Sequence, residues 1–105
     1  KPVASHTQRA SLQMYKEGFD IADIAARRGL SAATVENHLA FFVSNGELQA
    51  TDIVKREKLD KILALIKQTG ETRAAKPLKD LLPDDYTYGE IRIAMGYYQA
   101  IADNA

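Results

Sequence analysis

The stretch from Ile21 to Phe42, IADIAARRGLSAATVENHLAFF, constrains the fold of this chain more than any other. Asp20 carries the short oxygen acceptor that a helix N-cap needs, and the apolar spacing after it predicts a helix that ends near Arg28. Gly29 can adopt the left-handed backbone conformation that a sharp corner requires. Ser31 can then cap a second helix, whose apolar residues recur at four- and three-residue steps along one face: Val35, Leu39 and Phe42. The pattern predicts two helices joined by a tight corner.

Helical patterns also dominate the rest of the chain, and no segment alternates apolar and polar residues long enough to indicate a strand. We expect an all-α fold, a compact helical domain that contains a helix-turn-helix. Residues 1–5 are predicted to form a flexible flank, with Ser5 or Thr7 as the cap of the first helix. The pattern of residues 47–54 is ambiguous. We expect an extended stretch there, followed by a single turn that is capped by Thr51 or Asp52. The remaining helices are predicted over residues 7–17, 57–68, 77–82 and 87–101, the last opened by a capping box at Thr87-Tyr88-Gly89-Glu90.

Residues 78–95 resemble residues 21–39 in their pattern. In both segments two apolar residues three apart, a corner, a Ser/Thr cap and an aliphatic residue four positions beyond the cap follow in order. The likeness is either chance or the trace of two helix-turn-helix units in tandem, at residues 6–50 and 55–102. The matched residues are Leu78, Leu81, Thr87 and Ile91 beside Ile21, Ile24, Ser31 and Val35.

Composition excludes several classes of protein. The chain has 14 basic and 14 acidic residues and no cysteine, so it has neither the basic excess of a dedicated nucleic-acid binder nor a disulfide or thiolate zinc site. No run of residues is apolar enough for a membrane span or a signal peptide, and we expect a cytoplasmic, nucleoid-associated protein. Phosphate-binding loops and nucleophile motifs are missing, and the adjacent pair Asp84-Asp85 is most simply a turn. We therefore expect no catalytic residue, no metal and no cofactor in this chain.

The second helix of the first unit, residues 31–45, contains no lysine or arginine. In a helix-turn-helix this helix lies in the major groove, and the residues opposite its apolar stripe face the bases. Asn37 can then contact adenine and Glu36 can accept from cytosine, while Ser31 and Thr34 can bond phosphates. The rest of this face is alanine, at Ala32, Ala33 and Ala40.

Basic residues elsewhere are the better candidates for phosphate contacts. Arg27 and Arg28 lie at the corner, although they are equally well explained as charges at a helix C-terminus. Between residues 55 and 79 basic residues prevail over acidic ones, and after residue 80 the balance reverses. The candidates there are Lys55, Arg56, Lys58 and Lys61, with a solvated helix exterior and a Glu57–Lys61 pair as the alternative. Tyrosines at helical spacing can stack on unpaired bases or line the edge of the core: Tyr86, Tyr88, Tyr97 and Tyr98.

Residues from His6 to about Ala102 resemble the helix-turn-helix domain at the C-terminus of RecQ-type ATP-dependent DNA helicases. The likeness is carried by ADIAARRGLSAATVENHLAFFVSNGEL, by KPLKDLLPDDYTYGEIRIAMGYY and by the spacing between these blocks. It implies an accessory domain, not itself an enzyme, whose helicase motor domains lie elsewhere in the parent chain. The missing initiator methionine also predicts a piece of a longer protein. The positions that match the recognition helix are Ser31, Thr34, Asn37 and His38, although a packed or surface role suits His38 better than that of a ligand.

Because this helix lacks basic residues, we expect weak, mainly non-specific DNA binding. The alternative is a protein-interaction module that docks the helicase core or a repair protein, since the alanine-rich face suits close helix packing equally well. The DNA-binding half of a transcription regulator is a third interpretation, disfavoured by the sparse recognition helix.

Overall fold

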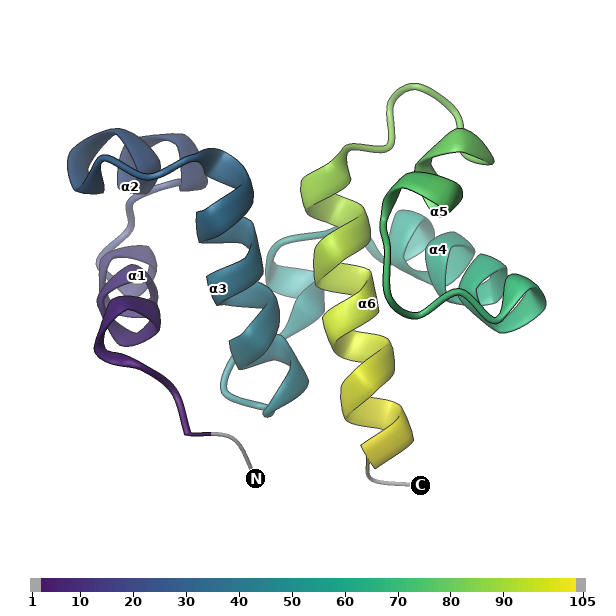
Figure 1. The fold of residues 1–105 in the computed structure, drawn as a ribbon, viewed down its shortest axis with the longest axis horizontal. Helices are drawn as coiled ribbons and strands as arrows, with labels where there is room; N and C mark the ends of the chain where they lie inside the picture. Colours follow the sequence, from purple (N-terminus) through teal and green to yellow (C-terminus); the bar gives the residue numbers. More distant parts are fainter. Residues whose placement is uncertain (1–2, 104–105) are drawn as a thin grey trace.

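Six α-helices and one 3-10 turn make up residues 3–103, the part of the chain that the computed structural model describes (Figure 1). Residues 1–2 of the expected N-terminal flank lie outside the described residues. The described part contains no strand, which confirms the all-α prediction. The helices are α1 (His6–Lys16), α2 (Ile21–Arg28), α3 (Ala32–Ser44), η1 (Ala50–Asp52), α4 (Arg56–Thr69), α5 (Lys76–Asp80) and α6 (Tyr88–Asp103).

The helix starts follow the polar caps that the sequence predicts. Ser5 and Gln8 form a reciprocal capping box at α1, in which the Gln8 amide donates to Ser5 Oγ at 3.1 Å and the Ser5 amide donates to Gln8 Oε1 at 2.9 Å. Thr87 and Glu90 repeat this arrangement at α6, at 3.1 and 2.9 Å. The predicted capping box at residues 87–90 is confirmed.

The corner between α2 and α3 also has the predicted geometry. Gly29 adopts a left-handed conformation with φ of 66°, and its amide donates to the Ala25 carbonyl. Asp20 caps α2 by accepting from the Asp23 amide at 2.8 Å, and Ser31 caps α3. These short-range interactions fix the helix-turn-helix.

Two segments differ from the prediction. The single turn after α3 spans Ala50–Asp52, so Thr51 and Asp52 lie within it instead of capping it, and it has no side-chain cap. The helix α5 stops at Asp80 instead of Leu82, because Pro83 disfavours helical backbone in the residue before it. Leu81, the expected counterpart of Ile24, is 63% exposed, and Leu82 is buried in its place.

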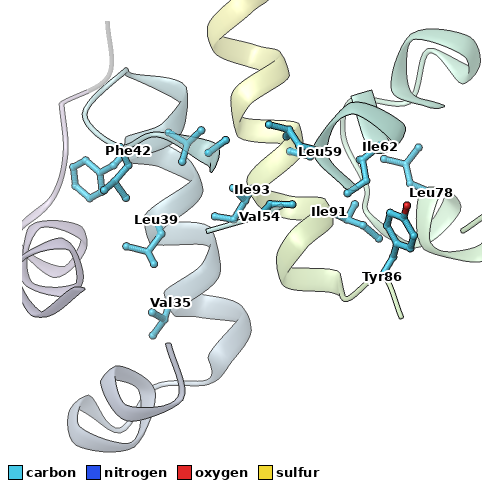
Figure 2. Packing of buried hydrophobic residues seen from close by; sticks show 14 of the residues in the cluster. Val35, Leu39, Phe42, Val54, Leu59, Ile62, Leu78, Tyr86, Ile91 and Ile93 are labelled. Carbon is cyan, nitrogen blue, oxygen red and sulfur yellow. The ribbon is translucent and has the colours of Figure 1, made fainter. Parts of the chain in front are cut away.

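The helices α3 and α6 lie side by side in the middle of the domain and run in the same direction, with α1 and α2 on one flank and α4 and α5 on the other (Figure 1). Each central helix turns one apolar face toward its own flank. Figure 2 shows Leu39 and Phe42 on the side of α3 that faces α1, and Ile91 close to Ile62 and Leu78 on the other side of α6. All five are fully buried in one continuous cluster, so the two predicted units share a core.

A glycine allows α3 and α6 to approach this closely. A Cβ placed on Gly96 of α6 would lie 2.5 Å from the carbonyl oxygen of Ala40 on α3, closer than real Cβ atoms come to backbone. One turn earlier, Arg92 Nη1 donates to Glu36 Oε1 at 2.6 Å across the same seam. Backbone contact and an ion pair therefore join the two helices directly.

The residues that meet across this seam occupy equivalent positions in the proposed repeat. Glu36 and Arg92 are 56 positions apart, as are Ala40 and Gly96. The same separation relates the caps of the two helices and the first buried aliphatic residue of each: Ser31 and Thr87, Val35 and Ile91. Contact between equivalent residues is the arrangement expected around a two-fold axis, and it supports the tandem-unit interpretation.

The close seam predicts that Gly96→Ala lowers stability, although glycine-to-alanine changes inside helices ordinarily stabilise. Helix propensity favours alanine by about 1 kcal/mol, whereas overpacking against rigid backbone costs roughly 1–3 kcal/mol. Because the obstacle is a backbone carbonyl, no rotamer change relieves it. We expect a lower denaturation midpoint for Gly96→Ala than for the wild type in chemical unfolding. Ala64→Gly on the exposed face of α4 reports the propensity effect without the seam. A Gly96→Ala variant as stable as the wild type would contradict the close approach.

Candidate nucleic-acid interface

The face of α3 that was predicted to read bases is partly covered by α6, at Glu36 and Ala40. Glu36 is bonded to Arg92, and its side chain is only 16% exposed. The backbone of Ala40 lies against Gly96. These two residues therefore do not face a major groove, contrary to the prediction, because small residues and a complementary charge let a second helix pack there. Asn37 remains exposed.

The hydroxyl groups at the start of α3 are used in its cap. Ser31 Oγ accepts from the Thr34 amide at 3.1 Å and lies 2.9 Å from Thr34 Oγ1. Ser31 and Ala32 are exposed, while Thr34 and Ala33 are half-buried. Phosphate contact by Ser31 and Thr34 stays a prediction.

Arg28 and His38 belong to a hydrogen-bonded chain that connects three helices. Arg28 Nη1 of α2 donates to Ser11 Oγ of α1 at 2.6 Å and to the Thr7 carbonyl at 2.8 Å. Ser11 Oγ lies 2.8 Å from Nδ1 of His38 on α3, and Ser11 is fully buried. Since Ser11 Oγ accepts from Arg28, its own hydrogen is free to point at an unprotonated Nδ1. These hydrogen bonds give Arg28 and His38 a structural role, because they hold the three helices of the first unit together.

The same surroundings disfavour a charged imidazole. Partial burial lowers the pKa of His38 below its usual value, and the positive charge of Arg28 lowers it further. A neutral His38 is therefore part of the native state.

Arg27, the other arginine of the corner, lies at the surface. Its guanidinium carbon is 4.5 Å from the centre of the Phe19 ring, within cation–π range. The stacked side chain remains exposed.

Lys58 is fixed between α4 and the start of α6. Its Nζ donates to the carbonyl of Asp85 and to the Glu90 carboxylate at 3.1 and 3.3 Å, and it lies 5.0 Å from the centre of the Tyr86 ring. Glu90 also accepts from the Thr87 amide, so the lysine reinforces the capping box of α6. The side chain is 22% exposed. Sequence reasoning did not identify this role because the partners lie far along the chain.

Lys55, Arg56 and Lys61 are exposed, at the first turns of α4. Arg56 Nε lies 3.5 Å from Asp60 Oδ1, and both side chains are more than half exposed. The expected Glu57–Lys61 pair is not among the ion pairs of the described residues. These three cations remain available at the surface.

The structure also forms a basic cleft that sequence reasoning did not find. It has a volume of about 430 Å³ and lies between α3, α6 and the segment before α5. An adjoining groove of about 590 Å³ continues along the α3–α6 seam and shares two of its residues, Asn37 and Met95. The residues that matter for its chemistry are Asn37, Arg73, Lys76, Tyr88, Arg92 and Met95. Their convergence depends on the seam between α3 and α6, which no local pattern indicates.

No three histidine, aspartate or glutamate side chains within residues 3–103 gather in a way that could hold a metal ion. Asp85, of the adjacent acidic pair, has its Oδ2 3.8 Å from Lys58 Nζ. None of the helices in the same range is both long and apolar enough to cross a bilayer.

Comparison with known proteins identifies the family. The family described as "Helix-turn-helix domain" matches residues 7–95, and the chain belongs to it. The chain is also similar to Protein YpbB of Bacillus subtilis (strain 168), with 29% identity over 104 residues, which cover 87% of this chain and 26% of YpbB. It thus spans about a quarter of the length of that relative. No solved structure matches the chain.

The environment of His38 predicts that the domain loses stability as the pH falls. With the folded-state pKa depressed, the contribution of a neutral His38 is complete above the unfolded value of about 6.5 and is lost as the pH falls through the folded pKa. His38→Asn keeps an acceptor for Ser11 but does not titrate in this range. Chemical unfolding at several pH values between about 7.5 and 5.5 should give a smaller decrease for the variant than for the wild type. Equal decreases would show that His38 is not coupled to folding.

Proposed function

We propose that this helix-turn-helix domain is an accessory domain of a RecQ-like ATP-dependent DNA helicase, to which it adds weak, mainly non-specific DNA binding. The observation that carries the proposal is the position of α6 on the reading face of α3. A helix covered in this way offers few base contacts, whereas cations outside the seam can still meet phosphates. Such contacts position a protein on DNA without specifying a sequence.

The helicase part of the proposal rests on the two sequence blocks that resemble the C-terminal domain of RecQ-type enzymes. The match to about a quarter of YpbB supports the idea that such a domain works as one part of a larger protein. A small neutral domain suits this role, because tethering to motor domains raises its effective concentration at the DNA.

The phosphate contacts are assigned to the exposed cations at the start of α4. Lys55 and Arg56 lie at its N-terminal end, and Lys61 is exposed further along the helix. The Arg56–Asp60 pair is a solvated i, i+4 pair, which contributes little to stability, so Arg56 can exchange Asp60 for a phosphate. Lys58 is assigned no DNA contact, because its ammonium group is already bound to Glu90.

Docking to the helicase core or to a repair protein is the competing function. It is favoured by Leu81, a large apolar side chain that is 63% exposed at the end of α5. The alanines at the start of α3, Ala32 and Ala33, offer a second small apolar surface. Ala33→Arg or Leu81→Glu would weaken such docking and leave DNA affinity unchanged.

The proposed phosphate contacts predict that Lys55→Glu/Lys61→Glu weakens duplex binding to the same extent for unrelated DNA sequences. Removal of two phosphate contacts should lower the slope of log affinity against log salt by about 2. Fluorescence anisotropy with two labelled duplexes of different sequence, from low to near-physiological salt, measures both quantities. Lys67→Glu, an exposed lysine at the other end of α4, changes the net charge by half as much and is the control for a general charge effect.

Two results would contradict the proposal. If Lys67→Glu weakens binding as much as the double variant, overall charge and not a local site governs the interaction. If the wild type binds no DNA even at low salt, the domain is not an autonomous DNA-binding module, and docking becomes the better interpretation.

A further inference from the structure

We infer that the cleft between α3, α6 and residues 73–76 binds an unpaired nucleic-acid strand, with phosphate held by Arg73 and Lys76 and a base stacked on Tyr88. The inference rests on the proposed function, since it names the form of nucleic acid that the domain prefers and a site for it. The site is separate from the exposed cations at the start of α4.

The shape of the cleft suits a single strand better than a duplex. A duplex is read by an element that protrudes into its major groove, which is about 12 Å wide. Here the only polar residue of the α3 reading face that stays exposed, within residues 3–103, is Asn37, and it lines a hollow. Volumes of about 430 Å³ and 590 Å³ for the cleft and the adjoining groove lie in the range of sites for small organic groups. Because the two hollows share Asn37 and Met95, they form one path along the seam.

The charge of the cleft favours an anion. Its lining contains the cations Arg73, Lys76 and Arg92 and no carboxylate. Arg92 Nη1 lies 2.6 Å from Glu36 Oε1, and this ion pair holds the Arg92 side chain in place. Lys76 lies 3.2 Å from Asp80, but the two side chains are 74% and 60% exposed, so a phosphate can replace that partner. Arg73 is also exposed, with the Glu71 carboxylate as a nearby opposite charge.

The rim that carries Arg73 is held in place before any ligand arrives. The Glu71 carboxylate accepts from the amides of Arg73 and Ala74 at 2.8 and 3.0 Å. The Glu71 amide in turn donates to Thr69 Oγ1 at the end of α4, at 3.2 Å. Through these bonds the Glu71 carboxylate orders the loop that carries Arg73. A preformed loop lowers the entropy cost of binding.

The other wall of the cleft offers contacts for a base. Tyr88 is 38% exposed, and Arg92 lies 5.3 Å from the centre of its ring, so a base can extend an existing stack. Asn37 faces the same hollow with an amide that can donate to and accept from a base edge. Phe41 and Gln99 continue the path into the adjoining groove. Cations beside an aromatic ring and an amide are the combination used to bind unpaired strands with little sequence preference.

The test is fluorescence anisotropy with a labelled oligothymidylate, which forms no secondary structure, beside a duplex of mixed sequence. Arg73→Glu/Lys76→Glu should weaken binding of the single strand roughly tenfold or more, and Lys16→Glu/Lys67→Glu, an exposed pair with the same change in charge outside both proposed sites, much less. Tyr88→Leu should also weaken it roughly tenfold, while Tyr88→Phe, which keeps the ring, should bind as the wild type does. Thermal unfolding of each variant identifies any loss of fold. Chemical shifts of the Asn37 side-chain amide in the wild type, recorded during the same titration, report binding without any substitution.

The possible results distinguish a failure of the cleft assignment from a failure of the proposed function. If Arg73→Glu/Lys76→Glu binds oligothymidylate like the wild type, and the Asn37 amide does not shift, the assignment of the single strand to the cleft is wrong. The proposed DNA binding through α4 is not affected by this result. If polyglutamate displaces oligothymidylate as effectively as unlabelled oligothymidylate does, the cleft recognises acidic chains in general and the assignment to nucleic acid is overturned. If neither DNA form binds at low salt, the proposed function fails, and the cleft assignment fails with it.

Discussion

The contact between the backbones of α3 and α6 at Ala40 and Gly96 determines most of what this domain can do. It brings together two helices that would each present an outer face to DNA if their units stood apart. Once the backbones meet, the Glu36–Arg92 pair closes over the seam, Leu39 and Ile91 face the flanking helices, and Ile93 lies between the two central helices. The fold gains one shared core and loses a reading surface. A cleft with cationic and aromatic walls is left at the edge of the seam.

Some of the basic side chains are bound to other residues of the protein. Two basic residues that were candidates for phosphate contacts are bound inside the protein, Arg28 by Ser11 and Lys58 by Glu90, and Arg92 is bound by Glu36. The Lys58 and Arg92 pairs join helices that are distant in sequence. Most other basic residues of the described part stay exposed, but the chain has as many acidic residues as basic ones, which agrees with the proposed weak and non-specific DNA binding.

Local chemistry made much of the fold predictable from the sequence. Short side chains with oxygen acceptors, a glycine at a left-handed corner and apolar spacing identified the starts and ends of all six α-helices to within two residues, because each depends mainly on neighbours within four positions. The candidate site was less predictable. The roles of Glu36 and Lys58 depend on partners 56 and 32 positions away, and the importance of Gly96 depends on a backbone that a linear pattern does not show. The resemblance between residues 21–39 and 78–95, which matches Ser31 with Thr87, was the one long-range signal in the sequence that pointed toward the seam.

The central claim is that α6 covers the reading face of α3 in the working protein, and this contact can be measured directly. In solution, nuclear Overhauser effects between the Hα protons of Gly96 and Ala40 report the distance between the two backbones. The structure predicts a strong cross-peak that persists when duplex DNA is added, because the proposed phosphate contacts lie at the start of α4, outside the seam. A cross-peak that is missing, or that disappears on addition of duplex while the amides of Glu36 and Ala40 shift, would show that α3 opens to the DNA and would contradict the account.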